Sequence, residues 1–309
     1  MSTLVSENQL HRYVLFTSFC TVLLLSAGAL VTGTGSGLAV PDWPLSYGRF
    51  FPPMVGGVLF EHGHRLVAGS VALFTIGMAY LFYAFERRKW VRKVAYAALG
   101  AVFMQALLGG VTVLLRLPKA VSISHACLAQ LFFSLTVVLA VLTSGSWRAL
   151  SASGSFGTWV VTRFLCAGLT FFFFCQLVLG ASVRHFKAGL AIPDFPRSFG
   201  HWLPSEFPLG VFLHFAHRIG AFLIVFLVGS VVVRTLRRHS DQLFLTLLVG
   251  LLGTLVCLQI LLGATIIWAH RPLSVTTLHL VVGAGCLAVS AAVTVVVLRL
   301  TSLSKEATE

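Results

Sequence analysis

Long apolar runs recur along the whole chain, separated by shorter polar segments. Each run is about 20 residues long, the length that an α-helix needs to cross a bilayer core of ~30 Å. The runs lack the alternation of a membrane β-barrel, and backbone groups in lipid must be satisfied within the helix itself. The pattern predicts an all-α integral membrane protein with eight spans, near residues 13–33, 63–85, 94–115, 121–143, 160–183, 211–233, 242–267 and 275–298.

The two halves of the chain repeat one pattern. Residues 37–48 read GLAVPDWPLSYG and residues 189–200 read GLAIPDFPRSFG, an offset of 152, and QALLGG (105–110) matches QILLGA (259–264) at an offset of 154. Agreement over four helices indicates an internal duplication. Because four spans return the chain to its starting side, we expect two tandem, parallel four-helix bundles. They comprise residues 1–150 and 151–309, joined by the Ser/Gly-rich stretch near 144–160.

Composition and charge agree with a membrane protein and argue against a nucleic-acid partner. The chain has 57% hydrophobic and 10% charged residues, against about 25% charged residues in soluble domains. The net charge of +13 invites a nucleic-acid partner, but thirteen of the 22 Lys and Arg residues lie on the predicted side of the termini and seven on the other side. By the positive-inside tendency, both termini face the cytoplasm of a multi-pass protein in the cell (inner) membrane, and we expect no nucleic-acid partner.

Four histidines pair across the repeat: His64 with His217, and His125 with His279. They lie near the starts of the second, fourth, sixth and eighth spans, so all four share one depth in the outer third of the membrane. A lone interfacial histidine is usually hydrogen-bonded to a carbonyl and has no further role. Two matched pairs favour function, because ionisable residues within a membrane are functional candidates.

Two facing imidazoles in an apolar bundle limit the choice of ligand. Di-metal bundle sites recruit several carboxylates, and here only Glu61 is near. Zinc prefers three or four ligands. Two histidines alone suit the axial positions of a heme, which predicts one bis-histidine heme in each half, toward the outer face. Arg65 and Arg218 follow two of the histidines; they are candidates to pair with heme propionates, or they extend to the interface as solvated charges.

The halves differ three residues before these histidines, where Glu61 precedes His64 and His214 precedes His217. Residues at i and i+3 share a helix face, so a carboxylate reaches the first pocket and has no counterpart in the second. The alternative is a solvated carboxylate or a charge at a helix start. The two Pro-Asp-aromatic-Pro loops are interpreted as lids, with Asp42 and Asp194 capping turns.

The doubled plan, the GLAVPDWP and GLAIPDFP loops, the EHGHR and LHFAHR segments, His125 and His279 together resemble heme A synthase. The resemblance implies oxidation of the C8 methyl group of heme O to a formyl group, by successive hydroxylations and dehydration, giving heme A for heme-copper oxidases. It places heme O or heme A between His64 and His125 and a heme B between His217 and His279, with Glu61 as the catalytic residue. Residues 34–61 contain no cysteine, so the chain resembles members without a cysteine pair in the first outer loop.

The resemblance also implies partners, and two other functions stay open. Heme O would come from a heme O synthase, and the four-electron oxidation needs an external electron acceptor or donor. Contacts with membrane lipid and a homo-oligomer are further expectations. The rivals are a b-type cytochrome that oxidises quinol and a heme transporter. A transporter needs a polar path, whereas the glutamines Gln105, Gln176 and Gln259 are interpreted as helix-packing residues beside small neighbours.

Overall fold

The computed structural model describes residues 2–151 and 154–307 and is all-helical over them, with two isolated β-bridges in place of any strand. Eight of its helices are long and apolar enough to cross a membrane, as the apolar runs predict. In chain order the helices are α1 Ser2–Gly33, α2 Gly57–Phe85, α3 Lys89–Leu114, α4 Lys119–Thr143, α5 Gly145–Arg148, α6 Phe156–His185, α7 Leu209–Arg238, α8 Leu243–Trp268 and α9 Leu273–Glu306.

The helices extend beyond the predicted spans, because hydropathy marks the lipid-facing part and not the hydrogen-bonded ends. The largest difference that bears on function is in α2, which begins at Gly57 and not near residue 63. Glu61 therefore lies in the second turn of a helix and not in a loop. The expected linker near 144–160 contains the short helix α5, whose N-cap Ser144 accepts a hydrogen bond from the backbone N–H of Trp147; its residues 152–153 lie outside the described residues.

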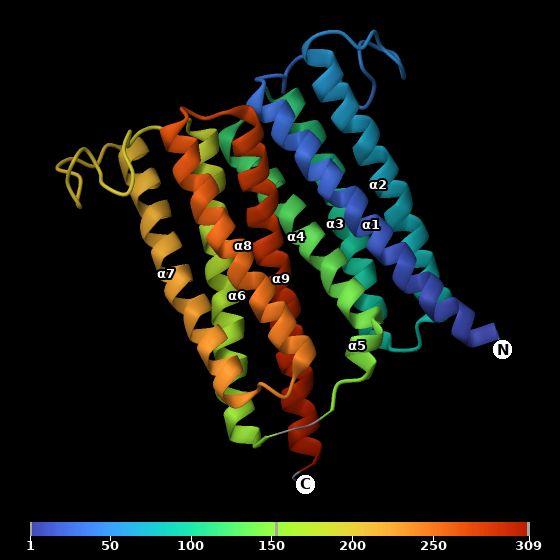
Figure 1. Ribbon diagram of the computed structural model, residues 1–309. Helices are drawn as coiled ribbons and strands as arrows, with labels where there is room; N and C mark the ends of the chain where they lie inside the picture. The colour runs from blue at the N-terminus through green and yellow to red at the C-terminus, as the bar shows by residue number, and fades with distance from the viewer. Residues whose placement is uncertain (1, 152–153, 308–309) are drawn as a thin grey trace.

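Each half of the chain closes into a ring of four helices. In the first half α1 contacts α2 and α4, and α3 contacts α2 and α4; in the second half α6 contacts α7 and α9, and α8 contacts α7 and α9. Figure 1 shows the two groups side by side, with the long loops 34–56 and 186–208 at the same end of the molecule and both chain ends at the other. We call the end with these loops the loop end.

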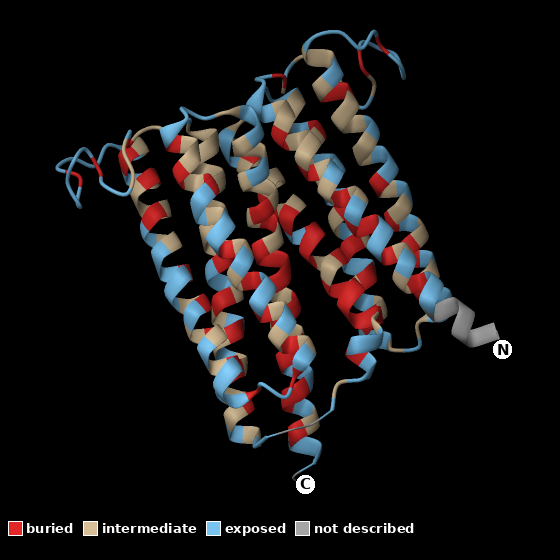
Figure 2. Cartoon of the chain, in the orientation of Figure 1, coloured by how far each residue is buried: buried red, intermediate tan, exposed pale blue. Residues whose placement is uncertain are grey.

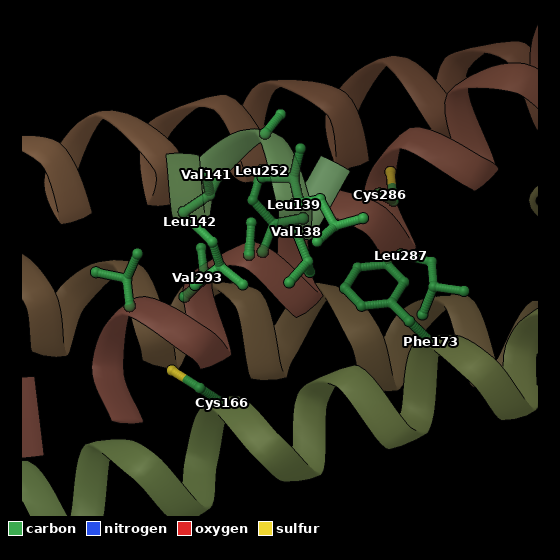
Figure 3. Packing of buried hydrophobic residues seen from close by; sticks show 14 of the residues in the cluster. Val138, Leu139, Val141, Leu142, Cys166, Phe173, Leu252, Cys286, Leu287 and Val293 are labelled. Carbon is green, nitrogen blue, oxygen red and sulfur yellow. The ribbon is translucent and has the colours of Figure 1, made fainter. Parts of the chain in front are cut away.

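Helices α4 and α9 form the centre of the molecule, where the two rings meet. Buried residues concentrate on these two helices (Figure 2), while α7 and α8 contain fewer of them. Leu139 of α4 and Val293 of α9 are buried in one continuous cluster with Phe173 of α6 (Figure 3). Hydroxyl contacts add to this packing, since Thr170 of α6 lies 2.8 Å from the Ser290 hydroxyl and 2.9 Å from that of Thr294 in α9. The two rings thus share one core.

We expect Leu139→Ala to destabilise the protein by about 2 kcal/mol or more, because it opens a cavity in this shared core. Leu139 is fully buried, whereas Leu131 on the same helix is 36% exposed, so Leu131→Ala is the matched control. Thermal unfolding in detergent measures both. Equal losses for the two variants would contradict the placement of the core between α4 and α9.

Candidate functional site

The four paired histidines all face a glycine on the neighbouring helix. A Cβ added at each glycine would lie 3.1–3.3 Å from Cε1 of the imidazole, closer than almost all real contacts. Only a glycine lets the ring approach this closely. The pairs are Gly28 of α1 with His64 of α2, Gly109 of α3 with His125 of α4, Gly180 of α6 with His217 of α7, and Gly263 of α8 with His279 of α9.

These histidines share a depth in the molecule. Each lies six to eight residues into a helix that begins at the loop end, which corresponds to about 9–12 Å at ~1.5 Å per residue. In the second half the rings of His217 and His279 have their centroids 6.5 Å apart at an interplanar angle of 71°. The Nδ1 atoms of His64, His125 and His279 are buried without a hydrogen-bond partner among the described residues.

Glutamine side chains reach three of the four histidines. The amide nitrogen of Gln105 donates to the backbone oxygen of His125 at 2.8 Å. That of Gln176 donates to the backbone oxygen of His217 at 2.7 Å and lies 3.0 Å from its Nδ1. That of Gln259 lies 3.3 Å from Nε2 of His279. The interpretation of these glutamines as packing residues is therefore incomplete, since they also contact the histidines.

Arg65 holds the first long loop against α2. Its guanidinium donates to the backbone oxygens of Asp42 (2.7 Å), Leu45 (2.9 Å) and Val40 (3.2 Å), and it forms an ion pair with Glu61 at 2.8 Å. Arginine suits this role because its planar fork carries five N–H donors. The loop is thus tied to the same helix turn that carries His64.

Arg218 forms the equivalent clamp in the second half. It donates to the backbone oxygens of Asp194 (2.7 Å), Arg197 (2.8 Å) and Ile192 (3.3 Å), each 152 residues after the acceptors of Arg65. Its Nε is buried without a partner among the described residues, and this donor is available to a further anionic group. The predicted contact of both arginines with heme propionates stays a prediction.

Glu61 and His214 occupy the same place in the two clamps but differ in chemistry. The carboxylate of Glu61, which is 3% exposed, accepts a 2.8 Å hydrogen bond from the backbone N–H of Val40. His214 accepts one from the equivalent N–H, that of Ile192, at 3.3 Å through Nδ1. Glu61 is therefore buried, which contradicts the alternative of a solvated loop carboxylate.

His62 and Trp43, to which the sequence assigns no role, both make contacts between the first long loop and the helices of its bundle. His62 is buried, and its Nδ1 lies 2.7 Å from the Ser46 hydroxyl. The indole of Trp43 lies against Gly110 of α3, where a Cβ would come within 2.7 Å of it. Gly110 directly follows the glycine that faces His125, so Trp43 covers the loop end of that histidine's surroundings.

Asp42 and Asp194 cap tight turns in the two loops, as the sequence predicts. Asp42 accepts hydrogen bonds from the backbone N–H groups of Tyr47 (2.7 Å) and Gly48 (2.8 Å), and these bonds hold its pKa below the ordinary value. For Asp194, burial raises the pKa, but hydrogen bonds from Gly200 and Phe199 outweigh it, so its pKa is also lowered. A lowered pKa keeps each carboxylate charged in more acidic solution than an ordinary aspartate, so the turns lose these acceptors only below the usual range.

The donor set of the histidine sites is limited to paired imidazoles. Among the described residues, no group of three or more His, Cys, Asp or Glu side chains is placed to hold a metal ion. The six cysteines are all described and free. The arrangement therefore offers two neighbouring imidazoles in the second half, and in the first half two imidazoles at the same depth with one buried carboxylate near them.

Comparison with known proteins assigns the family. The chain is similar to the heme A synthase of Alkalihalophilus pseudofirmus, with 30% identity over 285 residues that cover 88% of this chain and 92% of the relative. It is also similar to the heme A synthase of Halalkalibacterium halodurans, with 29% identity over 276 residues that cover 85% and 88%. A family model described as COX15-CtaA, cytochrome oxidase assembly protein, matches residues 55–291.

The chain belongs to the heme A synthase family. With its eight apolar helices, this member is a multi-pass membrane protein. The match begins at residue 55, so it includes Glu61 and all four paired histidines.

We expect Arg218→Gln in this family member to loosen the loop 186–208 and to increase trypsin cleavage after Arg197 several-fold. The substitution removes the donors to three loop carbonyls, including that of Arg197 itself. Digestion of the purified protein, followed by mass spectrometry, measures the cleavage. Arg237→Gln, at the other end of α7, is the control. Unchanged cleavage would mean that the Asp194 turn alone holds the loop.

Proposed function

We propose that the chain is a heme A synthase that oxidises the C8 methyl group of heme O to a formyl group, giving heme A for heme-copper oxidases. Two successive hydroxylations give a geminal diol, which loses water to leave one oxygen atom in the formyl group. The observation that carries the proposal is the asymmetry of the two clamps, in which a buried carboxylate stands one turn from His64 and a histidine, His214, stands in its place near His217.

The second half fits a resident heme B. Two metal–imidazole bonds of about 2 Å, plus roughly 1 Å from each nitrogen to its ring centre, place the centroids of two axial imidazoles about 6 Å apart. The centroids of His217 and His279 are 6.5 Å apart. Bound there, heme B would supply one-electron redox chemistry beside the substrate site. The chain's own contribution is to fix the two rings through Gly180 and Gly263.

The first half is proposed to bind the substrate, heme O, between His64 and His125. The rings are set by Gly28 and Gly109 in the same way as in the second half. Trp43, from the loop 34–56, lies against Gly110 of α3 at the loop end of this bundle. Heme O delivered by a heme O synthase, and an external electron partner for the four-electron oxidation, complete this proposal.

Glu61 is proposed as the catalytic carboxylate. Its two partners, the Val40 N–H and the Arg65 guanidinium, are both donors, as an ionised carboxylate requires. Residues at i and i+3 share a helix face, which turns the Glu61 side of α2 toward the heme held by His64. There it accepts protons released by the oxidation, or stabilises positive charge that develops on the substituent. The ion pair with Arg65 fixes its position.

The duplicated plan underlies this division of work. We propose that residues 1–150 form the substrate half and residues 151–309 the heme B half, related as parallel repeats, with both termini cytoplasmic and the pockets toward the outer face. In support of this, the closed helix ring and the arginine clamp occur once in each half, and the glycine–histidine contact occurs twice in each half.

We expect Glu61→Gln to lower heme A formation by about 100-fold or more, the scale of a lost acid–base group, while heme B stays bound. Glutamine keeps an acceptor for the Val40 N–H, so the loop stays closed. Glu61→Ala also removes heme A formation but loosens the loop, which raises trypsin cleavage after Arg49. Extraction and chromatography of the hemes measures the product. Near-normal heme A in Glu61→Gln would reduce Glu61 to a positioning residue.

We expect His217→Ala to remove the low-spin heme B spectrum, because one of the two axial imidazoles is lost. Optical spectra and heme extraction of the purified variant check this. The control is His201→Ala, since His201 is an exposed loop residue. A variant with the low-spin heme B spectrum unchanged would refute the ligand assignment.

A further inference from the structure

Each histidine-facing glycine is preceded, one helical turn earlier, by a residue that also lies at the histidine. In three of the four helices this residue is a glutamine: Gln105 in α3, Gln176 in α6 and Gln259 in α8, each four residues before its glycine. In α1 the equivalent residue, four before Gly28, is Leu24. The difference between the helices therefore lies in this side chain, which is a carboxamide in three of them and an alkyl group in the fourth.

The glutamine side chains are incompletely satisfied. Their amide nitrogens contact the histidines, but the Oε1 atoms of all three are buried without a hydrogen-bond partner among the described residues. The amide nitrogens reach different atoms: the backbone oxygen of His125, the backbone oxygen and Nδ1 of His217, and Nε2 of His279. Each carboxamide therefore ties a histidine to the neighbouring helix.

A metal-ligating histidine normally depends on such surrounding contacts, which fix its position and ring orientation. Gln176 and Gln259 lie at ring nitrogens of His217 and His279, and Gln105 holds the backbone oxygen of His125. Leu24 has no polar atom in its side chain, so α1 offers His64 no equivalent contact.

Building on the proposed function, we propose that the three glutamines are positioning residues for the axial histidines, and that His64 is the weakly held ligand that leaves the iron of the substrate heme. His125, supported by Gln105, then keeps heme O in the first half. Both ligands of the second half have a glutamine, so the resident heme stays bound on both faces. The open position falls on the α2 side of the substrate heme, which is the side that carries Glu61.

The first test compares two ligand variants of the full chain, produced with a source of heme O. We expect His64→Ala to retain heme O or heme A, with the iron in a high-spin, five-coordinate state, and His125→Ala to lose it. Heme B serves in each sample as the reference for correct folding. Loss of the substrate heme in His64→Ala but not in His125→Ala, or equal retention in both, would overturn the proposal.

The second test changes the glutamine pattern itself. Leu24→Gln gives His64 the missing carboxamide, so we expect the fraction of reduced substrate heme that binds carbon monoxide to fall several-fold. Gln105→Leu removes the support of His125, and we expect heme affinity in the first half to fall by about tenfold or more. Unchanged carbon monoxide binding in Leu24→Gln would contradict the role assigned to Leu24.

The heme content of the wild-type protein distinguishes a failure of this inference from a failure of the proposed function. If it contains heme B but neither heme O nor heme A, the synthase proposal fails. If heme O is present and His64 and His125 hold it equally, the synthase proposal stands and the inference about His64 fails.

Discussion

The close contact between an imidazole and a glycine on the adjacent helix is the constraint on which the structure depends. Each ring packs against the backbone of the neighbouring helix, at a distance that a Cβ on the facing residue would crowd. The contact occurs four times, once for each pair of helices α1–α2, α3–α4, α6–α7 and α8–α9. It therefore constrains the register of these four helix pairs and sets all four histidines at one depth.

The arginine clamps extend this order to the loops. Arg65 and Arg218 follow His64 and His217 directly, so the residue that ties down each loop is rigidly connected to the residue that faces the pocket. The clamp is the same in both halves down to the equivalent carbonyls, and the change from Glu61 to His214 preserves the hydrogen bond to the loop. Hydrogen bonding to the loop thus permits either side chain, and only a requirement for charge or proton transfer distinguishes a carboxylate from an imidazole there.

The sequence was sufficient for the helices and for the paired histidines, because hydropathy and repeated ionisable residues are visible in one dimension. It was insufficient for Gly28 and Gln176, since a glycine or glutamine in an apolar run indicates only packing until the facing helix is known. The partners of Arg65 were also hidden, because they lie in a loop about 20 residues away that returns to the helix. Glu61 was recognised by its difference from His214, but its burial depends on α2 starting at Gly57, which hydropathy does not mark.

The differences between the halves gather around the first pocket, which is what a substrate site requires. At equivalent positions, the first half has Leu24, Trp43, Glu61 and Gly110 where the second half has Gln176, Phe195, His214 and Ala264. A resident heme has to stay bound through many reactions, so firm support on both faces serves it. A substrate heme must enter, expose its iron or its substituent, and leave as product, so equally firm support on both faces would oppose turnover. On the proposed function one copy holds its heme less tightly than the other, and the side chains around His64 are where this chain departs from its own repeat.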